Sequence, residues 1–120
     1  MGKRINQPAC GSWFVPGGRI RKGEDIGSAH TRISDVELGV NLRRADGRLI
    51  GVFDHRYDTN FANAKGISTQ YVVVAYEYCL AIELRDLPLV QHSEWRWFSE
   101  SESGEVHRNS ATYFQSVNVQ

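Results

Sequence analysis

The 120-residue sequence has only two cysteines, no net charge and no long hydrophobic run. Cys10 and Cys79 lie far apart without a CxxC spacing, which favours small buried thiols of a cytosolic protein over a disulfide or redox pair. Lys and Arg balance Asp and Glu at 14 each, so no overall field recruits nucleic acid or an anionic membrane. Because no apolar run approaches about 18 residues and no signal-peptide pattern follows Met1, we expect a cytoplasmic protein without a membrane partner.

The length and the order of predicted elements indicate one α+β domain over residues 1–120. The run 13–15 reads as a buried strand that ends in the turn Pro16-Gly17-Gly18. Apolar residues recur at helical spacing over 25–38, and Gly39 stands where a C-terminal cap belongs. We predict further strands within 49–53, 70–84 and 94–98, and a short C-terminal helix around 110–114.

The first eight residues have too little apolar character to open a domain with a core strand. The predicted sheet therefore lacks an opening strand, and one of its edges is expected to lie unpaired.

Gly18, Glu24 and Arg32, followed by Glu37-Leu38-Gly39-Val40, stand at the spacing of the Nudix box. The chain therefore resembles the Nudix hydrolases, which cleave nucleoside diphosphates linked to another group. The resemblance implies a mixed sheet flanked by helices. It also implies that Gly18, Glu24, Arg32 and Gly39 have structural roles in the motif.

Two glutamates of the family pattern are replaced here by Ile33 and Val36, so this face of the predicted helix keeps Glu37 alone. Asp35 cannot substitute, because it lies about 200° around the helix from Glu37. One carboxylate can hold one Mg²⁺ if a backbone carbonyl, waters and substrate phosphate oxygens complete an octahedron. The motif therefore predicts a site for a single metal ion.

The same two glutamates are absent from the GDP-mannose mannosyl hydrolases, a Nudix branch that the chain resembles over nearly its whole length. The matching stretches include Gly2-Lys3-Arg4, Trp13-Phe14-Val15-Pro16-Gly17-Gly18-Arg19, Tyr71-Val72-Val73, Asn60-Phe61, Gln91-His92 and Arg96-Trp97. The resemblance implies Mg²⁺-dependent hydrolysis of a GDP-sugar, GDP-mannose or GDP-glucose, to GDP and free sugar. Water would attack C1 of the sugar with inversion.

The resemblance also implies roles for individual residues. The Gly17 carbonyl and Glu37 would hold the metal, and His92 would be the general base, which suits a side chain whose ordinary pKa is about 6.5. Arg4, Arg19 and Tyr71 would bind the leaving phosphates. His55, Tyr57, Asp58 and Trp95 are expected to contact the substrate. The neutral alternatives are a surface acid at Glu37, an exposed loop histidine at His92, and an exposed His30 without a role.

Relatives in this branch carry further residues before the Gly-Lys-Arg segment, so we expect an N-terminally truncated fold. A homodimer with exchanged or rearranged strands could cover the gap. The acidic stretch 100–105 is expected to be a solvated loop. Two other functions stay open: a Nudix pyrophosphatase in which water attacks phosphorus, and a catalytically silent dimeric binding protein.

Overall fold

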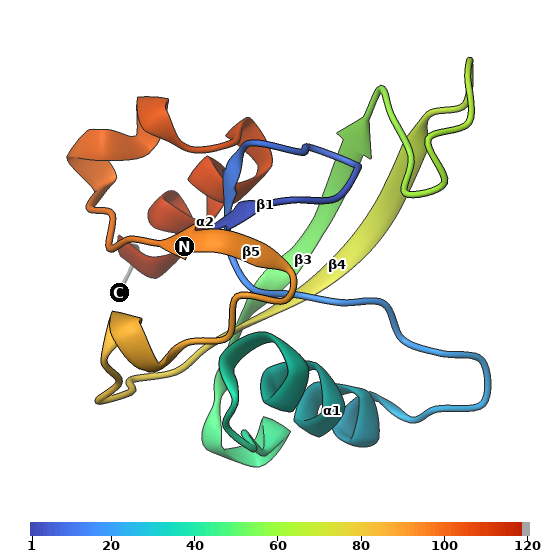
Figure 1. Ribbon diagram of the computed structural model, residues 1–120. Coiled ribbons are helices and arrows are strands. Elements are labelled where there is room, and N and C mark those ends of the chain that lie inside the picture. Colours follow the sequence, from blue (N-terminus) through green and yellow to red (C-terminus); the bar gives the residue numbers. More distant parts are fainter. Residues whose placement is uncertain (119–120) are drawn as a thin grey trace.

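Within residues 1–118, which the computed structural model describes, the chain forms two antiparallel sheets and two α-helices (Figure 1). One sheet has the strand order β2-β1-β5, and the other pairs β3 with β4. The strands are β1 (Gly2–Arg4), β2 (Trp13–Phe14), β3 (Arg48–Tyr57), β4 (Thr69–Glu77) and β5 (His92–Trp95). The helices are α1 (Ile26–Leu38) and α2 (Arg108–Asn118), with 3₁₀ helices η1 (Arg44–Asp46), η2 (Leu84–Asp86) and η3 (Glu100–Glu105) in the connections. The predicted α+β class is confirmed.

Helix α1 begins and ends where the sequence predicts, because both of its caps are local. The Asp25 carboxylate accepts a 2.7 Å hydrogen bond from the backbone N–H of Ser28 at the start of the helix. At the other end Gly39 has φ 71°, a left-handed conformation that glycine adopts without steric cost, and its N–H bonds the Asp35 carbonyl.

Strand β1 corrects the expectation that the first residues form no strand. It is the central strand of its sheet, with Gly2 opposite Phe14 on one side and opposite Trp95 on the other. Backbone pairing on both sides holds this segment, so it needs few apolar side chains of its own. Lys3 reaches outward, with its ammonium 5.9 Å from the centre of the Trp13 ring and 3.7 Å from Glu94.

The strands β3 and β4 form a long twisted ribbon between α1 and α2 (Figure 1). Its inner face carries His55 and Tyr57, which are both buried, and its outer face carries the exposed Val52 and Val72. The stretch 70–84, for which the sequence predicts one or two strands, forms a single strand that ends at Glu77.

The chain leaves the ribbon at Tyr78, whose hydroxyl lies 2.5 Å from His30 Nε2 and donates to the Arg43 carbonyl at 2.7 Å. His30 is therefore half-buried and hydrogen-bonded. The expectation from the sequence that it is exposed is wrong.

The core is rich in aromatic rings from β2, β3 and α2. Phe14 lies 6.0 Å from Tyr57 and 5.2 Å from the His107 ring, measured between ring centroids. Helix α2 is tied to β2 by two hydrogen bonds: the His107 N–H donates to the Trp13 carbonyl, and the fully buried Ser110 hydroxyl accepts from the Val15 N–H. These contacts place the start of α2 against the first sheet.

Three other local predictions are wrong. His92 lies at the start of β5 and not in a loop, because β5 runs over His92–Trp95 instead of 94–98. The acidic stretch forms η3, capped by Ser99 and Glu102, and Arg96 pairs with Glu102 and Glu105. Both cysteines are free and exposed rather than buried.

No helix of the described residues is both long and apolar enough to cross a membrane.

Candidate active site

Glu37 and His92 form a hydrogen-bonded pair that joins α1 to β5. The carboxylate oxygen Oε2 of Glu37 lies 2.7 Å from His92 Nε2, and the two side chains are only 11% and 3% exposed. Glu37 stands in the last turn of α1, and His92 opens β5, directly opposite Arg4 of β1. The structure thus brings together the predicted metal ligand and the predicted general base from positions 55 residues apart.

The imidazole of His92 is enclosed on three sides. The Trp95 ring packs against it at 4.5 Å between centroids, and Trp95 is itself anchored by a 2.8 Å bond from its indole N–H to the Pro88 carbonyl. On the β1 side, a Cβ added at Gly2 would lie 2.3 Å from His92 Nδ1. Only glycine fits there, so β1 sets the position of the histidine.

The hydrogen bond to Glu37 restricts where His92 carries its protons. An ionised carboxylate can only accept a hydrogen bond, so beside it Nε2 carries a proton; a neutral ring then has its lone pair on Nδ1, whereas a protonated ring carries hydrogen on both nitrogens. Nδ1 is buried and has no hydrogen-bond partner among the described residues. The basic nitrogen of this tautomer therefore faces Gly2 and not the solvent.

The segment between β2 and α1 is braced by an ion pair. Arg32 of α1 holds both carboxylate oxygens of Glu24, at 2.8 and 2.9 Å, and its Nη2 also donates to the Arg19 carbonyl at 2.7 Å. The hydrogen bond from Arg32, with a second from the Arg21 N–H, lowers the pKa of Glu24 from 4.5 to about 2. These contacts are those of a structural brace, the role that the motif predicts for Glu24 and Arg32.

Ile33 packs directly against the glycine turn. A Cβ added at Gly18 would lie 2.9 Å from Ile33 Cγ1. An apolar contact therefore occupies the place where the family pattern would bring a carboxylate. Gly17, next in the turn, is exposed and has open space around it.

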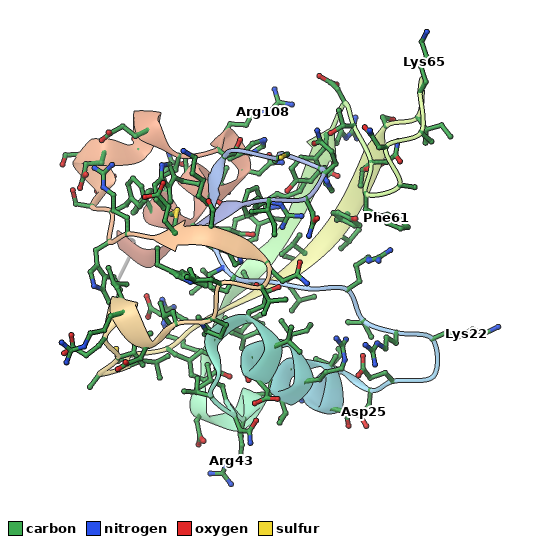
Figure 2. All side chains as sticks on the ribbon, in the orientation of Figure 1. Lys22, Asp25, Arg43, Phe61, Lys65 and Arg108 are labelled. Atoms are coloured by element: carbon green, nitrogen blue, oxygen red, sulfur yellow. The ribbon has the colours of Figure 1, made fainter. Side chains whose placement is uncertain are left out.

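Arg19 points its guanidinium at Phe61, with Cζ 4.3 Å from the centre of the ring. Phe61 belongs to the connection between β3 and β4, and Figure 2 shows it on the flank of this hairpin. Lys22, three residues after Arg19 in the same segment, points away from the molecule (Figure 2). Arg19 thus turns back toward the loop that joins β3 and β4.

The remaining predicted phosphate ligands lie along β1 and the inner face of the ribbon. The Arg4 Nε donates to the Pro8 carbonyl at 2.8 Å, and its guanidinium lies 5.9 Å from the centre of the Phe14 ring. Tyr71 lies opposite His55 in the β3–β4 pair, 6.1 Å from the Tyr57 ring.

The predicted substrate-contacting residues are spread over several environments. His55 and Tyr57 lie in the aromatic core, where burial lowers the pKa of His55 and raises that of Tyr57. Asp58 is exposed at the end of β3, and Trp95 backs His92. Only Trp95 among these contacts the Glu37–His92 pair. The substrate roles of all four residues stay predictions.

The donor set fits one Mg²⁺ that takes most of its ligands from water and substrate. Glu37 can offer its second oxygen, Oε1, while Oε2 is bonded to His92. No group of three or more His, Cys, Asp or Glu side chains within residues 1–118 could hold a metal ion. Mg²⁺ commonly keeps several waters and binds through one or two carboxylates plus substrate phosphates, which matches this arrangement.

Two open hollows of the surface lie elsewhere, beside the first turns of α1. Their walls include Asp25, Gly27 and Thr31. One is also lined by Asp35, which lies on the far side of the helix from Glu37. Neither hollow includes Glu37 or His92.

Sequence reasoning gave no role to Gly2 or Phe61. A glycine inside a strand commonly marks a close approach, but the sequence predicts no strand at Gly2, so this signal could not be read there. No local signal connects Phe61 with Arg19, because their contact joins two loops that are distant in the sequence.

The chain belongs to the NUDIX domain family, whose model matches residues 1–116. The family supports hydrolase chemistry in general, and such enzymes typically use a divalent metal such as Mg²⁺. The chain is also similar to the Low-salt glycan biosynthesis protein Agl8 of Haloferax volcanii, at 39% identity over 105 residues. The aligned part is 87% of this chain and 64% of that protein, so the chain spans less than two thirds of this relative.

Replacing Gly2 with alanine should displace His92 from Glu37. The added methyl would overlap the imidazole, and such overpacking costs about 1–3 kcal/mol of the free energy of unfolding. We expect ¹⁵N NMR of the imidazole to show a changed proton distribution between Nδ1 and Nε2, and denaturant titration to show lower stability. The control is Gly104→Ala, where the added Cβ meets nothing within 4 Å. An unchanged His92 spectrum in Gly2→Ala would contradict the contact.

The Glu24–Arg32 brace should make stability depend on acid. Since the folded state lowers the pKa of Glu24 from 4.5 to about 2, the stabilisation is fully present above about pH 4.5 and is lost as the pH falls toward about 2. We expect Glu24→Gln to melt below the wild type at neutral pH, with the difference closing across this window. Thermal unfolding followed by circular dichroism at a series of pH values measures it, and a gap that does not change with pH would refute it.

Proposed function

We propose that the protein hydrolyses a GDP-sugar, GDP-mannose or GDP-glucose, to GDP and free sugar, with one Mg²⁺ ion and with water attacking C1 of the sugar. The observation that carries the proposal is the isolated Glu37–His92 pair at 2.7 Å. The pair supplies one carboxylate, which suits a single metal ion and not a cluster of ions, and one potential base. A single ion suits a reaction in which the charge of a departing diphosphate must be neutralised. The sequence resemblance to the GDP-mannose mannosyl hydrolases supplies the substrate.

The replacement of two carboxylates supports attack at carbon. Ile33 packs on Gly18, and Val36 is 46% exposed, so neither offers a ligand. Activation of water for attack at phosphorus commonly uses two metal ions to stabilise the attacking and leaving oxygens. Glu37 and the Gly17 carbonyl would hold a single Mg²⁺, which would supply positive charge to stabilise the GDP leaving group.

His92 acts as the general base through Nε2. Its other nitrogen is enclosed by Gly2, so only the Nε2 side can reach a water molecule. A His92 ring protonated on both nitrogens beside the ionised Glu37 would first lose its Nε2 proton to solvent as the carboxylate gives up the hydrogen bond. The neutral ring then keeps its proton on Nδ1, and Nε2 accepts the proton of water. Trp95 keeps the plane of the ring fixed during this exchange.

The arginines bind the diphosphate. Arg19 extends from the braced turn, and Arg4 lies opposite His92 across the β1–β5 pair. In the proposal both contact the phosphates of the substrate. A guanidinium can bond two phosphate oxygens at once, which holds the leaving group and offsets its charge. Tyr71 serves the same phosphate from the inner face of the ribbon.

The name of the Haloferax relative agrees with a sugar-related substrate, since that protein is described as acting in glycan biosynthesis. A homodimer and a cytoplasmic location are part of the proposal. Light scattering after size-exclusion chromatography measures the first, and a monomer at working concentration would exclude it.

Phosphorus NMR of the protein with GDP-mannose and Mg²⁺ tests the reaction. We expect GDP as the phosphorus-containing product, and a loss of rate of about 10²–10⁴-fold in His92→Gln, the usual cost of removing a general base. Glu37→Gln should reduce the rate by at least as much, because it removes the charge that holds the metal and the partner of His92.

Asp35→Asn is the matched control, because it removes a carboxylate from the opposite side of the same helix. Its rate should equal that of the wild type. GMP with a sugar phosphate as products would show attack at phosphorus and refute the mechanism. A folded protein that binds GDP and forms no product would favour the silent binding protein.

A further inference from the structure

The connection between β3 and β4 presents Phe61 to Arg19 in a defined geometry. The Arg19 Cζ lies 4.3 Å from the centre of the Phe61 ring, inside the range of about 6 Å for a cation–π contact. Phe61 is nevertheless 63% exposed, so burial of the ring does not explain its place. The contact joins the glycine turn to a loop that starts more than forty residues later in the sequence.

The loop that carries Phe61 is built around one buried side chain. Asn60 is 7% exposed, and its amide donates to the carbonyls of Ala64 and Ile67, both at 2.8 Å. Its side-chain oxygen accepts from the Ala64 N–H at 3.0 Å. The residue next to Phe61 therefore fixes the backbone of the loop, which makes the ring a preorganised platform.

Arg19 is held at its other end as well, because Arg32 donates to its carbonyl at 2.7 Å. Arg32 thus holds the backbone of Arg19, and Phe61 contacts its guanidinium. The Cζ atom of the guanidinium lies over the ring, and the N–H groups of a guanidinium lie in its own plane. No hydrogen bond within the described residues uses these N–H groups.

We propose that Phe61 is a positioning residue that orients the Arg19 guanidinium for bidentate binding of the diphosphate. The inference rests on the proposed function only for the contact of Arg19 with phosphate. Stacking occupies the face of the guanidinium and leaves its edge for two phosphate oxygens, so the two interactions are compatible. Phe61 lowers the conformational cost of ordering a long side chain when the diphosphate binds.

Isothermal titration with two probes, GDP and inorganic pyrophosphate, both with Mg²⁺, tests the inference without requiring turnover. Phe61→Leu keeps an apolar side chain but removes the π face, and we expect it to weaken both probes by about 2- to 5-fold, the range of an exposed cation–π contact. Phe61→Tyr should restore binding. Arg19→Met should weaken both probes about tenfold or more.

The double variant Phe61→Leu/Arg19→Met decides the role. A residue that acts through Arg19 adds no further loss once Arg19 is gone, so the double variant should match Arg19→Met. Trp97→Leu is the matched control, because Trp97 is also 63% exposed and should leave both affinities and the melting temperature unchanged. Since Phe61 is exposed, its variants should melt with the wild type.

Three outcomes would overturn the inference. Phe61→Leu could weaken GDP but not pyrophosphate, which would place the ring against the base. Its effect could persist in the Arg19→Met background, or it could be absent. Failure of the proposed reaction can be distinguished from failure of this inference. Absence of GDP release in the NMR assay would refute the reaction, whereas the role of Phe61 is decided by the binding titrations alone.

Discussion

The hydrogen bond between Glu37 and His92 is the contact on which the proposed site depends. It connects the end of α1 with the first residue of the edge strand β5, and both side chains are almost completely buried. A buried carboxylate without a partner is costly, so the pair satisfies Glu37 while it fixes the imidazole. A substitution of Glu37, the proposed metal ligand, would therefore also affect His92, the proposed base.

This contact places demands on residues that have no chemistry of their own. Gly2 must lack a side chain, because the imidazole fills the space that its Cβ would occupy. Trp95 must be anchored, and its bond to the Pro88 carbonyl serves this purpose. The short strand β1 therefore does more than pair within the sheet. Its Gly2 closes one side of His92, and its Arg4 lies opposite His92 in the β1–β5 pair.

The sequence predicted what local chemistry determines and missed what distant pairing determines. The bounds of α1 follow from Asp25 and Gly39, and the isolation of Glu37 follows from helical spacing. By contrast, β1 becomes a strand through pairing with β2 and with the distant β5, whose His92 lies 88 residues after Arg4, so its own composition gave no sign of it. The sequence predicts a loop at His92 for the same reason, because its pairing partner in β1 is distant along the chain. The contact of Arg19 with Phe61 has no local signature either.

The replacement of two glutamates also changes what holds the site before any ligand arrives. Three carboxylates on one helix face repel one another unless cations neutralise them. Here Ile33 packs on Gly18, Glu24 is paired with Arg32, and Glu37 is bonded to His92. The turn and the helix end are thus fixed by protein contacts alone, with no like charges to separate. A site of this kind needs no metal to keep its shape. Under the proposed function, the ion would arrive with the diphosphate, whose oxygens would supply most of its ligands and whose developing charge the metal would stabilise.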